Sequence, residues 1–217
     1  MTTKAAHPDR DDGRRHRADG ERSRQAILTA AAELATIEGL DGLSVGRLAE
    51  HVGMSKSGVF AHFRSKEELQ IATVDTAFRI MDREVTQRGL AAPEGVARVY
   101  AFCDAFLSYV ERRVFPGGCF FINAAAELEA REGRVTDYVR EVYQGVLDGF
   151  TEEIRRAQAL GELDAAEDPA QLTFELDSFM VGANLALVFF GDRAAPDRAR
   201  AAIRDRLERL APPSRRS

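Results

Sequence analysis

The chain has 217 residues, enough for one large domain or two modest ones with a buried core. Hydrophobic residues make up 45% and charged residues 30% of it, which excludes a disordered, collagen-like or low-complexity protein. No apolar run reaches the ~18 residues of a membrane span, and the start lacks the apolar core of a signal peptide, so we expect a cytoplasmic protein with no membrane partner. Cys103 and Cys119 lie in apolar runs, which favours buried thiols over a disulfide.

The net charge of −5 is unevenly distributed. Residues 1–66 carry 11 Lys and Arg against 9 Asp and Glu, a balance of +2, whereas the remainder carries 19 against 26, a balance of −7. No acid occurs between Glu50 and Glu67, and the basic or titratable residues of that segment are His51, Lys56, His62, Arg64 and Lys66. A polyanion could therefore dock there. The larger part holds all four Tyr and 11 of the 13 Phe, the material for a core and an apolar pocket.

The predicted elements begin after a tail. Residues 1–20 and 211–217 have no apolar period and are expected to be disordered tails. Apolar side chains at helical spacing then predict a first helix that ends near Gly39. With the two short helices that follow, it forms an expected three-helix N-terminal domain over residues 21–66.

Residues 44–63 have the plan of a helix-turn-helix. Ser44 can cap a short helix, Gly53 breaks it, and Ser55 can cap a second short helix. The apolar residues expected to hold both against the first helix are Leu48, Val52, Val59, Phe60 and Phe63. The second helix has small or flexible side chains to present outward, as insertion into a major groove about 12 Å wide requires. The same spacing also fits a plain helical hairpin with a solvated tip.

Six further helices are predicted over a regulatory domain of residues 67–210. Ser65 caps the first of them, and Glu68 completes a capping box. Apolar stripes, Pro and Gly place the six helices at residues 66–88, 93–113, 119–131, 134–160, 169–190 and 196–210. The helix over 169–190 is apolar on two sides, so it needs two partners; its second face consists of Phe174, Val181, Leu185 and Val188. The whole chain is therefore predicted to be all-α, with nine helices.

A ligand pocket is expected among the helices between residues 93 and 190. Its candidate walls are Phe102, Phe106, Tyr109, Phe120, Phe121, Tyr143 and Phe179. Its candidate polar groups, set within apolar helices, are Asn123, Asp177 and Asn184. Buried polar groups need partners, and a ligand can be that partner. The alternative is that the aromatic residues are ordinary core and that Asn184 bonds a helix backbone or a second subunit. Cys119 at a helix start is either an oxidant-sensitive thiol or a small buried residue.

The run from Gln25 to Leu69 resembles the N-terminal DNA-binding domain of the tetracycline-repressor (TetR) family of bacterial transcription regulators. The resemblance is carried by an Ala-rich first helix, Gly39, Ser44, Leu48-Ala49-Glu50, Gly53-Met54-Ser55, Phe60 to Phe63, Ser65-Lys66-Glu67 and Leu69. One departure is Phe60, where most of the family has Tyr; without the hydroxyl we expect this position to pack rather than bind phosphate. The larger part resembles the family's regulatory domains only in helix count and layout.

The resemblance also implies roles for residues of the helix-turn-helix. Residues implied to hold phosphates are Ser44, Arg47, Ser55 and Lys66, and those implied at or near base edges are Lys56, Ser57 and His62. The two serines begin helices whose free N–H groups favour an anion. The alternative for each residue is an ordinary cap or a solvated charge, and His62 can equally pack beside Phe63.

By the same resemblance the chain is a regulator, by the family's usual mode a repressor, that binds a palindromic double-stranded operator and is released by a small-molecule effector. A homodimer is expected, because one helix-turn-helix reads few base pairs and a dimer places two copies about 34–36 Å apart. Residues 169–190 and 196–210 would form its four-helix bundle; alternatively, the second apolar face meets neighbours in the same chain. The effector would act through the helix over 66–88. No cofactor or metal is implied.

An enzymatic alternative rests on Gly42-Leu43-Ser44-Val45-Gly46, which fits the G-x-S-x-G elbow of hydrolases with Ser44 as nucleophile. That elbow needs a preceding strand, and the sequence predicts none. The histidines all lie at or before His62, which leaves the pocket region without the commonest general base. We therefore expect a protein that is not an enzyme. A helical adaptor that binds only proteins is a third alternative, and it predicts no salt-dependent DNA binding.

Overall fold

The computed structural model of the chain describes residues 9–212, with side chains from residue 19 onward. Every regular element in this range is a helix, which confirms the all-α prediction. The helices of the N-terminal part are α1 (Asp9–Glu38), α2 (Val45–His51) and α3 (Lys56–Phe60). They are followed by one continuous helical run made of α4 (Lys66–Met81), the π-helix η1 (Asp82–Thr86) and α5 (Gln87–Leu90).

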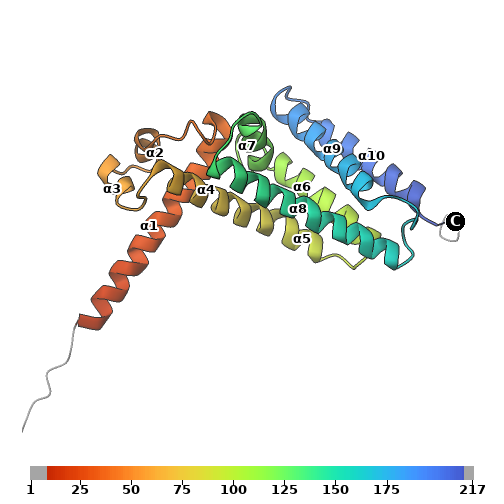
Figure 1. Ribbon diagram of the computed structural model, residues 1–217, viewed down its shortest axis with the longest axis horizontal. Helices are drawn as coiled ribbons and strands as arrows, with labels where there is room; N and C mark the ends of the chain where they lie inside the picture. Colours follow the sequence, from red (N-terminus) through yellow and green to blue (C-terminus); the bar gives the residue numbers. More distant parts are fainter. Residues whose placement is uncertain (1–8, 213–217) are drawn as a thin grey trace, which may run out of the picture.

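The larger part continues with five more helices. These are α6 (Val96–Glu111), α7 (Phe120–Leu128), α8 (Arg134–Ala159), α9 (Pro169–Val188) and α10 (Ala195–Leu210). With the run from α4 to α5 counted as one helix, the described residues contain the nine helices predicted. Figure 1 shows an elongated molecule with α2 and α3 at one end, α9 and α10 toward the other, and the start of α1 projecting away from the body.

The N-terminal helix is longer than the sequence predicts. A disordered tail is expected over residues 1–20, but α1 already begins at Asp9. Residues 9–20 contain no proline, and extending an existing helix costs much less than nucleating a new one, so the packed part of α1 can propagate backward through them. The rest of the expected tails, residues 1–8 and 213–217, lies outside the described residues.

Serine caps start the three helices that follow α1. The Oγ atoms of Ser44, Ser55 and Ser65 accept hydrogen bonds from backbone N–H groups three residues on, at 3.2, 3.1 and 3.1 Å. Each bond satisfies one N–H group that the helix itself leaves unpaired. Glu68 reaches back as predicted, although its carboxylate accepts from the N–H of Arg64 at 2.9 Å rather than from the cap residue itself. Local sequence signals thus set these helix starts.

The N-terminal helices share one apolar core with α4. Ile27 and Leu28 of α1 are buried there together with Leu48 of α2 and Val59 of α3. One predicted core residue is misplaced, because Phe60 is 58% exposed. The expectation that Phe60 packs is therefore wrong: α3 is a single short turn of helix, and its buried side already holds Val59, which leaves the neighbouring position outside.

The helix over 66–88 is predicted as uninterrupted, but the structure contains a π-helical segment at Asp82–Thr86 before α5. Such segments widen a helix locally and occur often at functional sites. Here Asp82, Val85 and Thr86 line a cavity. Beyond the π-segment, Gly89 lies so close to Phe102 of α6 that a Cβ there would approach the ring to 2.5 Å.

A second core cluster joins α6, α8, α9 and α10. Its buried members include Cys103, Leu107, Ile154, Leu176 and Ile203.

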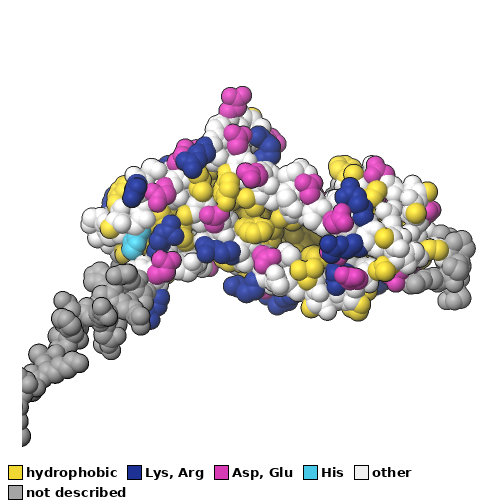
Figure 2. Space-filling view, turned by 60° about the horizontal axis from the view of Figure 1, so that its bottom comes forward, with side chains coloured by type: hydrophobic (Ala, Val, Ile, Leu, Met, Phe, Trp, Pro, Cys, Tyr) yellow, Lys and Arg dark blue, Asp and Glu magenta, His cyan; other side chains and the backbone are white. Residues whose placement is uncertain are grey.

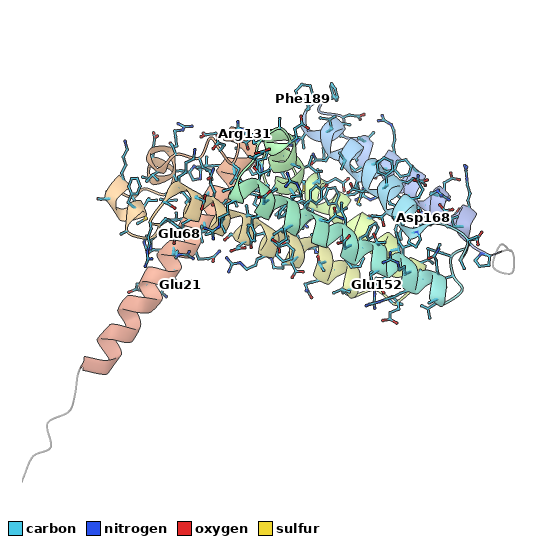
Figure 3. The ribbon with its side chains drawn as sticks, viewed as in Figure 1. Glu21, Glu68, Arg131, Glu152, Asp168 and Phe189 are labelled. Carbon is cyan, nitrogen blue, oxygen red and sulfur yellow. The ribbon has the colours of Figure 1, made fainter. Side chains whose placement is uncertain are left out.

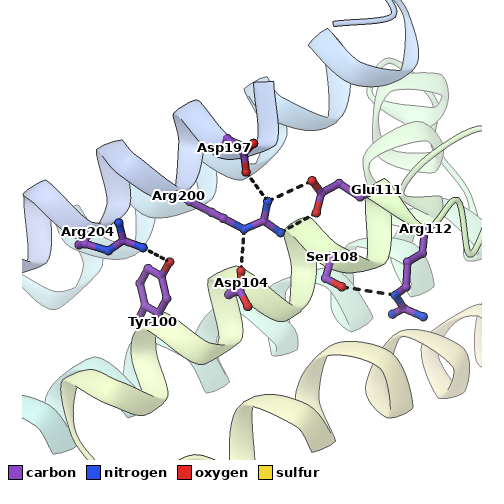
Figure 4. A network of polar contacts seen from close by, with 8 residues as sticks. All are labelled: Tyr100, Asp104, Ser108, Glu111, Arg112, Asp197, Arg200 and Arg204. Atoms are coloured by element: carbon purple, nitrogen blue, oxygen red, sulfur yellow. Dashed lines mark hydrogen bonds and ion pairs between the residues drawn. The ribbon is translucent and has the colours of Figure 1, made fainter. Parts of the chain in front are cut away.

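Charged contacts fasten α10 to this bundle (Figure 4). Arg200 of α10 binds Asp104 and Glu111 of α6 at 2.6 and 2.5 Å, and also Asp197 of its own helix at 3.0 Å. The Glu111 carboxylate raises the pKa of Arg200 further above its usual value. The position of α10 therefore depends on both apolar packing and this arginine.

Helix α9 is two-sided, as predicted, and its second face is covered only in part, since Val188 packs against the first core cluster. Leu172 and Leu176 are buried, whereas Phe174 and Leu185 on the opposite side are 67% and 53% exposed. Phe189, at the end of the helix, points away from the bundle (Figure 3). The alternative in which the second face is covered by helices of the same chain is therefore wrong for these residues.

We predict that Arg200→Ala lowers the free energy of unfolding by about 1–3 kcal/mol, because Asp104 and Glu111 then face each other without a cation. Chemical denaturation of the purified protein measures this change. The control is Arg155→Ala, which removes only an exposed pair with Glu152 and should cost no more than about 1 kcal/mol. Equal losses in the two variants would contradict the role assigned to Arg200.

Candidate functional sites

The helix-turn-helix is closed by a tight turn at Gly53. This residue has a φ of +66°, a conformation that glycine adopts without strain. The N–H of Gly53 donates to the carbonyl of Glu50 at 3.2 Å, and that of Met54 to the carbonyl of Ala49 at 2.9 Å. These bonds end α2 and direct the chain into α3. Figure 1 shows α3 at the extremity of the molecule, where a DNA groove can reach it.

The residues at the start of α3 that are predicted to contact DNA, one at a phosphate and two at base edges, are accessible. Ser55, Lys56 and Ser57 are all exposed, and the two serine hydroxyls lie 3.1 Å apart. Lys56 lies over the start of α2, where a Cβ at Gly46 would be 3.2 Å from its Cε. Among the described residues, Lys56 forms no ion pair. Its ammonium group is thus available to an anion.

The two cations implied to hold phosphates are already paired. Arg47 binds Glu38 at 2.5 Å, and Lys66 binds the Asp41 carboxylate at 3.2 Å. The arginine lowers the pKa of Glu38, and Arg131 followed by Lys66 lowers the pKa of Asp41. Arg47 is 62% exposed and Lys66 51%, so a phosphate can reach both cations and displace the carboxylates. Neither acid was predicted as a partner, because nothing in the local pattern links Glu38 to Arg47 or Asp41 to Lys66.

His62 occupies a different position from the exposed residues of α3. Its ring is half-buried and lies 6.4 Å from the ring of Phe63, tilted by 54°. Phe63 is also covered by Arg24 of α1, whose guanidinium lies 5.1 Å from the ring centre. The structure therefore favours packing, the alternative named above for His62.

A group of polar contacts joins the N-terminal domain to α7. Glu127 accepts hydrogen bonds from the N–H groups of Leu40 at 2.6 Å and Asp41 at 2.9 Å. Arg131 binds the Asp41 carboxylate at 2.5 Å. The sequence analysis singled out neither Glu127 nor Arg131, since they lie some 90 residues from their partners. Two glycines fit closely around this junction and the neighbouring loop: Gly39 against Glu127, and Gly117 against the carbonyl of Thr36.

A cavity of about 650 Å³ lies in the larger part. Helices α4, α5 and η1 form one wall and α8 the opposite one, with α6 and α9 contributing further residues. In Figure 2 an apolar hollow is visible in the middle of the molecule. The apolar lining residues are Phe78, Met81, Val85, Leu90, Phe102, Phe106, Cys119, Val142, Val146, Leu147, Phe150 and Met180, and Tyr138 and Tyr143 add phenol rings. The volume suits a small organic ligand.

Four of the ten predicted pocket residues line this cavity, namely Phe102, Phe106, Tyr143 and Asp177. Three predicted aromatic residues instead fill the core, where Tyr109 meets Phe115 edge-to-face at 6.1 Å between ring centres and Phe120 meets Phe121 edge-to-face at 5.3 Å. Phe179 packs against the second core cluster. These four side chains follow the alternative in which aromatics at helical spacing are core.

The two predicted asparagines bond the backbone rather than a ligand. Asn184 accepts a hydrogen bond from the N–H of Cys119 at 3.0 Å, at the start of α7. Asn123 donates to the carbonyls of Thr36 and Gly117 at 3.0 and 2.9 Å. The buried Asn184 thus has the structural role that the sequence analysis left open as an alternative.

The charged residues that line the cavity are all acidic. They are Asp75, Asp82, Glu141, Glu153 and Asp177. Burial raises the pKa of Asp177 to about 6. Burial also raises the pKa of the Cys119 thiol to about 11, so this cysteine is protonated near neutral pH and unreactive as a nucleophile.

The hydrolase alternative has no structural basis. Ser44 is the N-cap of α2, and its Oγ accepts a hydrogen bond from the N–H of Arg47. No strand precedes it or occurs elsewhere in residues 9–212, so the G-x-S-x-G match is a helix start and not a nucleophile elbow. Within the described part of the chain, no three His, Cys, Asp or Glu residues are placed to hold a metal ion. None of the described helices has the length and apolar character that crossing a membrane requires.

An all-helical chain with a helix-turn-helix exposed at one end has the architecture of a DNA-binding transcriptional regulator. Comparison with family models agrees: residues 27–73 match the bacterial regulatory proteins of the tetR family, and residues 95–203 match the tetracyclin repressor-like C-terminal domain. The chain therefore belongs to the TetR family of bacterial transcriptional regulators, and its N-terminal domain binds DNA. A comparison with curated proteins finds no match.

Solved structures of the family share the fold. A TetR transcriptional regulator from Chloroflexus aurantiacus J-10-FL is 25% identical, with 89% of this chain and 98% of that chain covered and a TM-score of 0.82. A TetR-family regulator from Streptomyces coelicolor is 21% identical, with 96% and 98% covered and a TM-score of 0.74. AibR, solved with isovaleryl coenzyme A and operator DNA, is 23% identical, with 88% and 98% covered and a TM-score of 0.65.

We predict that the carboxyl group of Asp177 makes the protein less stable as the pH rises from about 4 to about 6. In this window the folded chain holds a proton on Asp177 that the unfolded chain has lost, so the free energy of unfolding falls with rising pH. Asp177→Asn removes the group that titrates in this window. The free energy of unfolding of the variant minus that of the wild type should therefore be about 1–3 kcal/mol larger at pH 7 than at pH 4.

Urea denaturation at both pH values measures this difference. The control is Asp137→Asn, which changes an exposed carboxylate paired with Arg140 on the surface of α8. If Asp177→Asn and Asp137→Asn change the pH dependence equally, the burial assigned to Asp177 is wrong.

Proposed function

We propose that the chain is a transcriptional repressor that binds a palindromic operator as a homodimer and releases it when a small-molecule effector occupies the cavity. The observation that carries the proposal is the exposed, acid-free surface of α3, with Lys56 unpaired at the extremity of the molecule. A cavity of about 650 Å³ in a separate helical part supports the effector. The structure of AibR, with its acyl coenzyme A and operator, is consistent with this division of roles.

In the proposed DNA complex, Lys56 and Ser57 lie at base edges, and the helix starts at Ser44 and Ser55 bind phosphates. Each serine Oγ accepts an N–H bond from its own helix, which leaves the hydroxyl proton of Ser44 to donate to a phosphate oxygen. The Ser55 hydroxyl shares a hydrogen bond with that of Ser57, and it can donate to a phosphate when Ser57 is the donor of that bond. Arg47 and Lys66 exchange their carboxylate partners for phosphates, and each phosphate neutralised adds about 0.9 to the salt dependence of binding. We do not assign His62 a base contact.

The proposed dimer is formed by α9 and α10 of two chains. The support is the uncovered second face of α9, which exposes Phe174, Leu185 and Phe189. Single exposed apolar residues are common, but several along one helix mark an interaction surface. A two-fold axis through this face would make a four-helix bundle and set the two copies of α3 at a fixed separation.

The proposed coupling runs through α4, which connects both parts of the chain. Its start at Lys66 belongs to the helix-turn-helix, and its later residues Asp75, Phe78 and Met81 line the cavity. Tyr138 of α8 donates a hydrogen bond to Asp75 across the wall of the cavity. A ligand that separates α4 from α8 would strain this bond and tilt the helix-turn-helix. Reversing a 99:1 balance requires about 5.5 kcal/mol of differential affinity.

Acting on DNA, the protein would work in the cytoplasm beside the bacterial chromosome. We propose no catalytic activity and no resident cofactor.

We predict that Lys56→Ala weakens binding to the operator by about tenfold or more, because a base contact is worth about 1–3 kcal/mol. The operator is first selected from random duplex DNA with the full-length protein, and affinities are then measured by fluorescence anisotropy. The matched control is Arg140→Ala on α8, which should leave the affinity within twofold since it lies outside the helix-turn-helix. If Lys56→Ala binds the operator as tightly as the wild type, the proposed orientation of α3 on DNA is wrong.

A separate test concerns the dimer. We predict that Leu185→Glu converts the protein to monomers at micromolar concentration, because two carboxylates would meet in an apolar interface. Analytical ultracentrifugation measures the mass. The control is Leu160→Glu at the end of α8, a position with nearly the same exposure, 51% against 53%, but away from α9. A wild-type chain that sediments as a monomer, or a Leu185→Glu variant that remains dimeric, rules this interface out.

A further inference from the structure

The charge of the cavity indicates what kind of molecule it takes. The residues that line it include five carboxylates, and none is Lys, Arg or His. Most of the remaining lining is aliphatic or aromatic. We infer that the cavity binds a lipophilic cation, an aromatic or alkyl molecule with a protonated or quaternary nitrogen or an equivalent onium centre, and that Asp177 is its counterion. Only the identification of this cation as the effector rests on the proposed function.

Asp177 is the carboxylate that most needs such a partner. It lies on α9 in the lining of this cavity and of a smaller one beside it that also includes Arg155, and no residue of the described chain gives it a hydrogen bond or an ion pair. Its negative charge contributes to the raised pKa values of Cys103, Cys119 and Tyr143, all of which are neutral when protonated. A partly buried carboxylate with no cation paired to it carries an uncompensated desolvation cost, which a ligand cation would offset.

Three of the other acids already have partners in the protein. Asp75 accepts a hydrogen bond from Tyr138, and Asp82 accepts one from Gln87. Glu153 lies 2.9 Å from Arg156, and its other oxygen lies 3.5 Å from Arg98. The uncompensated charges are therefore Asp177 inside the cavity and the exposed Glu141 on α8.

The aromatic residues of the lining suit the same ligand. Phe102, Phe106 and Tyr143 lie in the wall, and aromatic faces attract organic cations. Phe150 meets Phe102 edge-to-face at 6.0 Å, which fixes the orientation of both rings. An anion of the same size would gain the apolar contacts but would face Asp177 without any cation to screen it. The lining therefore discriminates by the sign of the charge.

Two glycines keep the α8 side of the cavity open. Gly145 and Gly149 are one turn apart in α8, both are exposed, and a Cβ at either would meet no atom within 4 Å. Both belong to the cavity lining. Glycine is unfavourable inside a helix, and here no close neighbour requires it, so its effect is to leave space where a ligand would enter. A larger side chain at Gly149 should obstruct the cavity without displacing protein atoms.

The experiment compares three probes of similar shape and different charge: tetraphenylphosphonium, tetraphenylborate and the neutral triphenylphosphine oxide. Isothermal titration calorimetry of the full-length protein at pH 7.5 should show tetraphenylphosphonium binding at one site per chain and at least tenfold more tightly than either other probe. Asp177→Asn should weaken phosphonium binding at least tenfold and change the affinity for the neutral probe less than twofold. Glu152→Gln, which neutralises an exposed carboxylate on α8, is the matched control and should change neither.

A second variant tests the location without altering any charge. Gly149→Leu should weaken phosphonium binding at least tenfold by filling the mouth of the cavity, and thermal unfolding checks that each variant is folded. The inference is overturned if no phosphonium binding occurs up to millimolar concentration, if the borate binds as tightly, or if Asp177→Asn binds the phosphonium normally.

The link to DNA is measured separately, by operator binding with and without tetraphenylphosphonium. A decrease in operator affinity supports both the cation site and its role as the effector site. Cation binding that depends on Asp177 but leaves operator affinity unchanged would uphold the cation site and refute the proposed release mechanism.

Discussion

The orientation of the helix-turn-helix depends on two carboxylates, those of Glu127 in α7 and of Asp41 in the loop that follows α1. Glu127 accepts two backbone N–H groups from the loop that follows α1, and Asp41 in that loop binds both Arg131 and Lys66. One small loop is thereby tied to α7 and to the start of α4. These contacts are hydrogen bonds and ion pairs between partly exposed groups, so breaking one costs less free energy than separating a packed apolar surface. Rearranging a fully apolar interface would require unpacking it.

Local features of the fold were predictable from the sequence, since they depend on neighbours three or four residues away. Ser44, Ser55 and Ser65 start helices in the structure because each hydroxyl satisfies a nearby N–H. Pairings over long separations were not predictable. Nothing near Arg47 indicates that Glu38 would bind it, and nothing near Leu40 points to Glu127. The residues proposed to face DNA were predicted by family resemblance, while the ion pairs that Arg47 and Lys66 form became evident only from the structure.

The lining of the cavity was predictable from the sequence only in part. Phe102 and Phe106 line it while Tyr109, on the same helix, is buried core, and the spacing that identified all three cannot separate a wall from a core. The difference arises from the position of α4 and α8 around them. Asp177 was identifiable because a carboxylate in an apolar helix is unusual at any position. Its lack of a partner became evident only with every neighbour in place.

Several residues that line the cavity lower the stability of the fold. An uncompensated carboxylate at Asp177 and two glycines inside α8 both lower stability, and all three residues face the same space. A ligand cation bound beside Asp177, as proposed, would stabilise the conformation that holds the cavity open. Linkage requires the reverse effect to be equally large, so operator DNA that favours another position of α4 must weaken ligand binding by the same factor. The ligand affinity of the proposed regulator would then depend on the free energy by which Asp177 and the two glycines destabilise the fold.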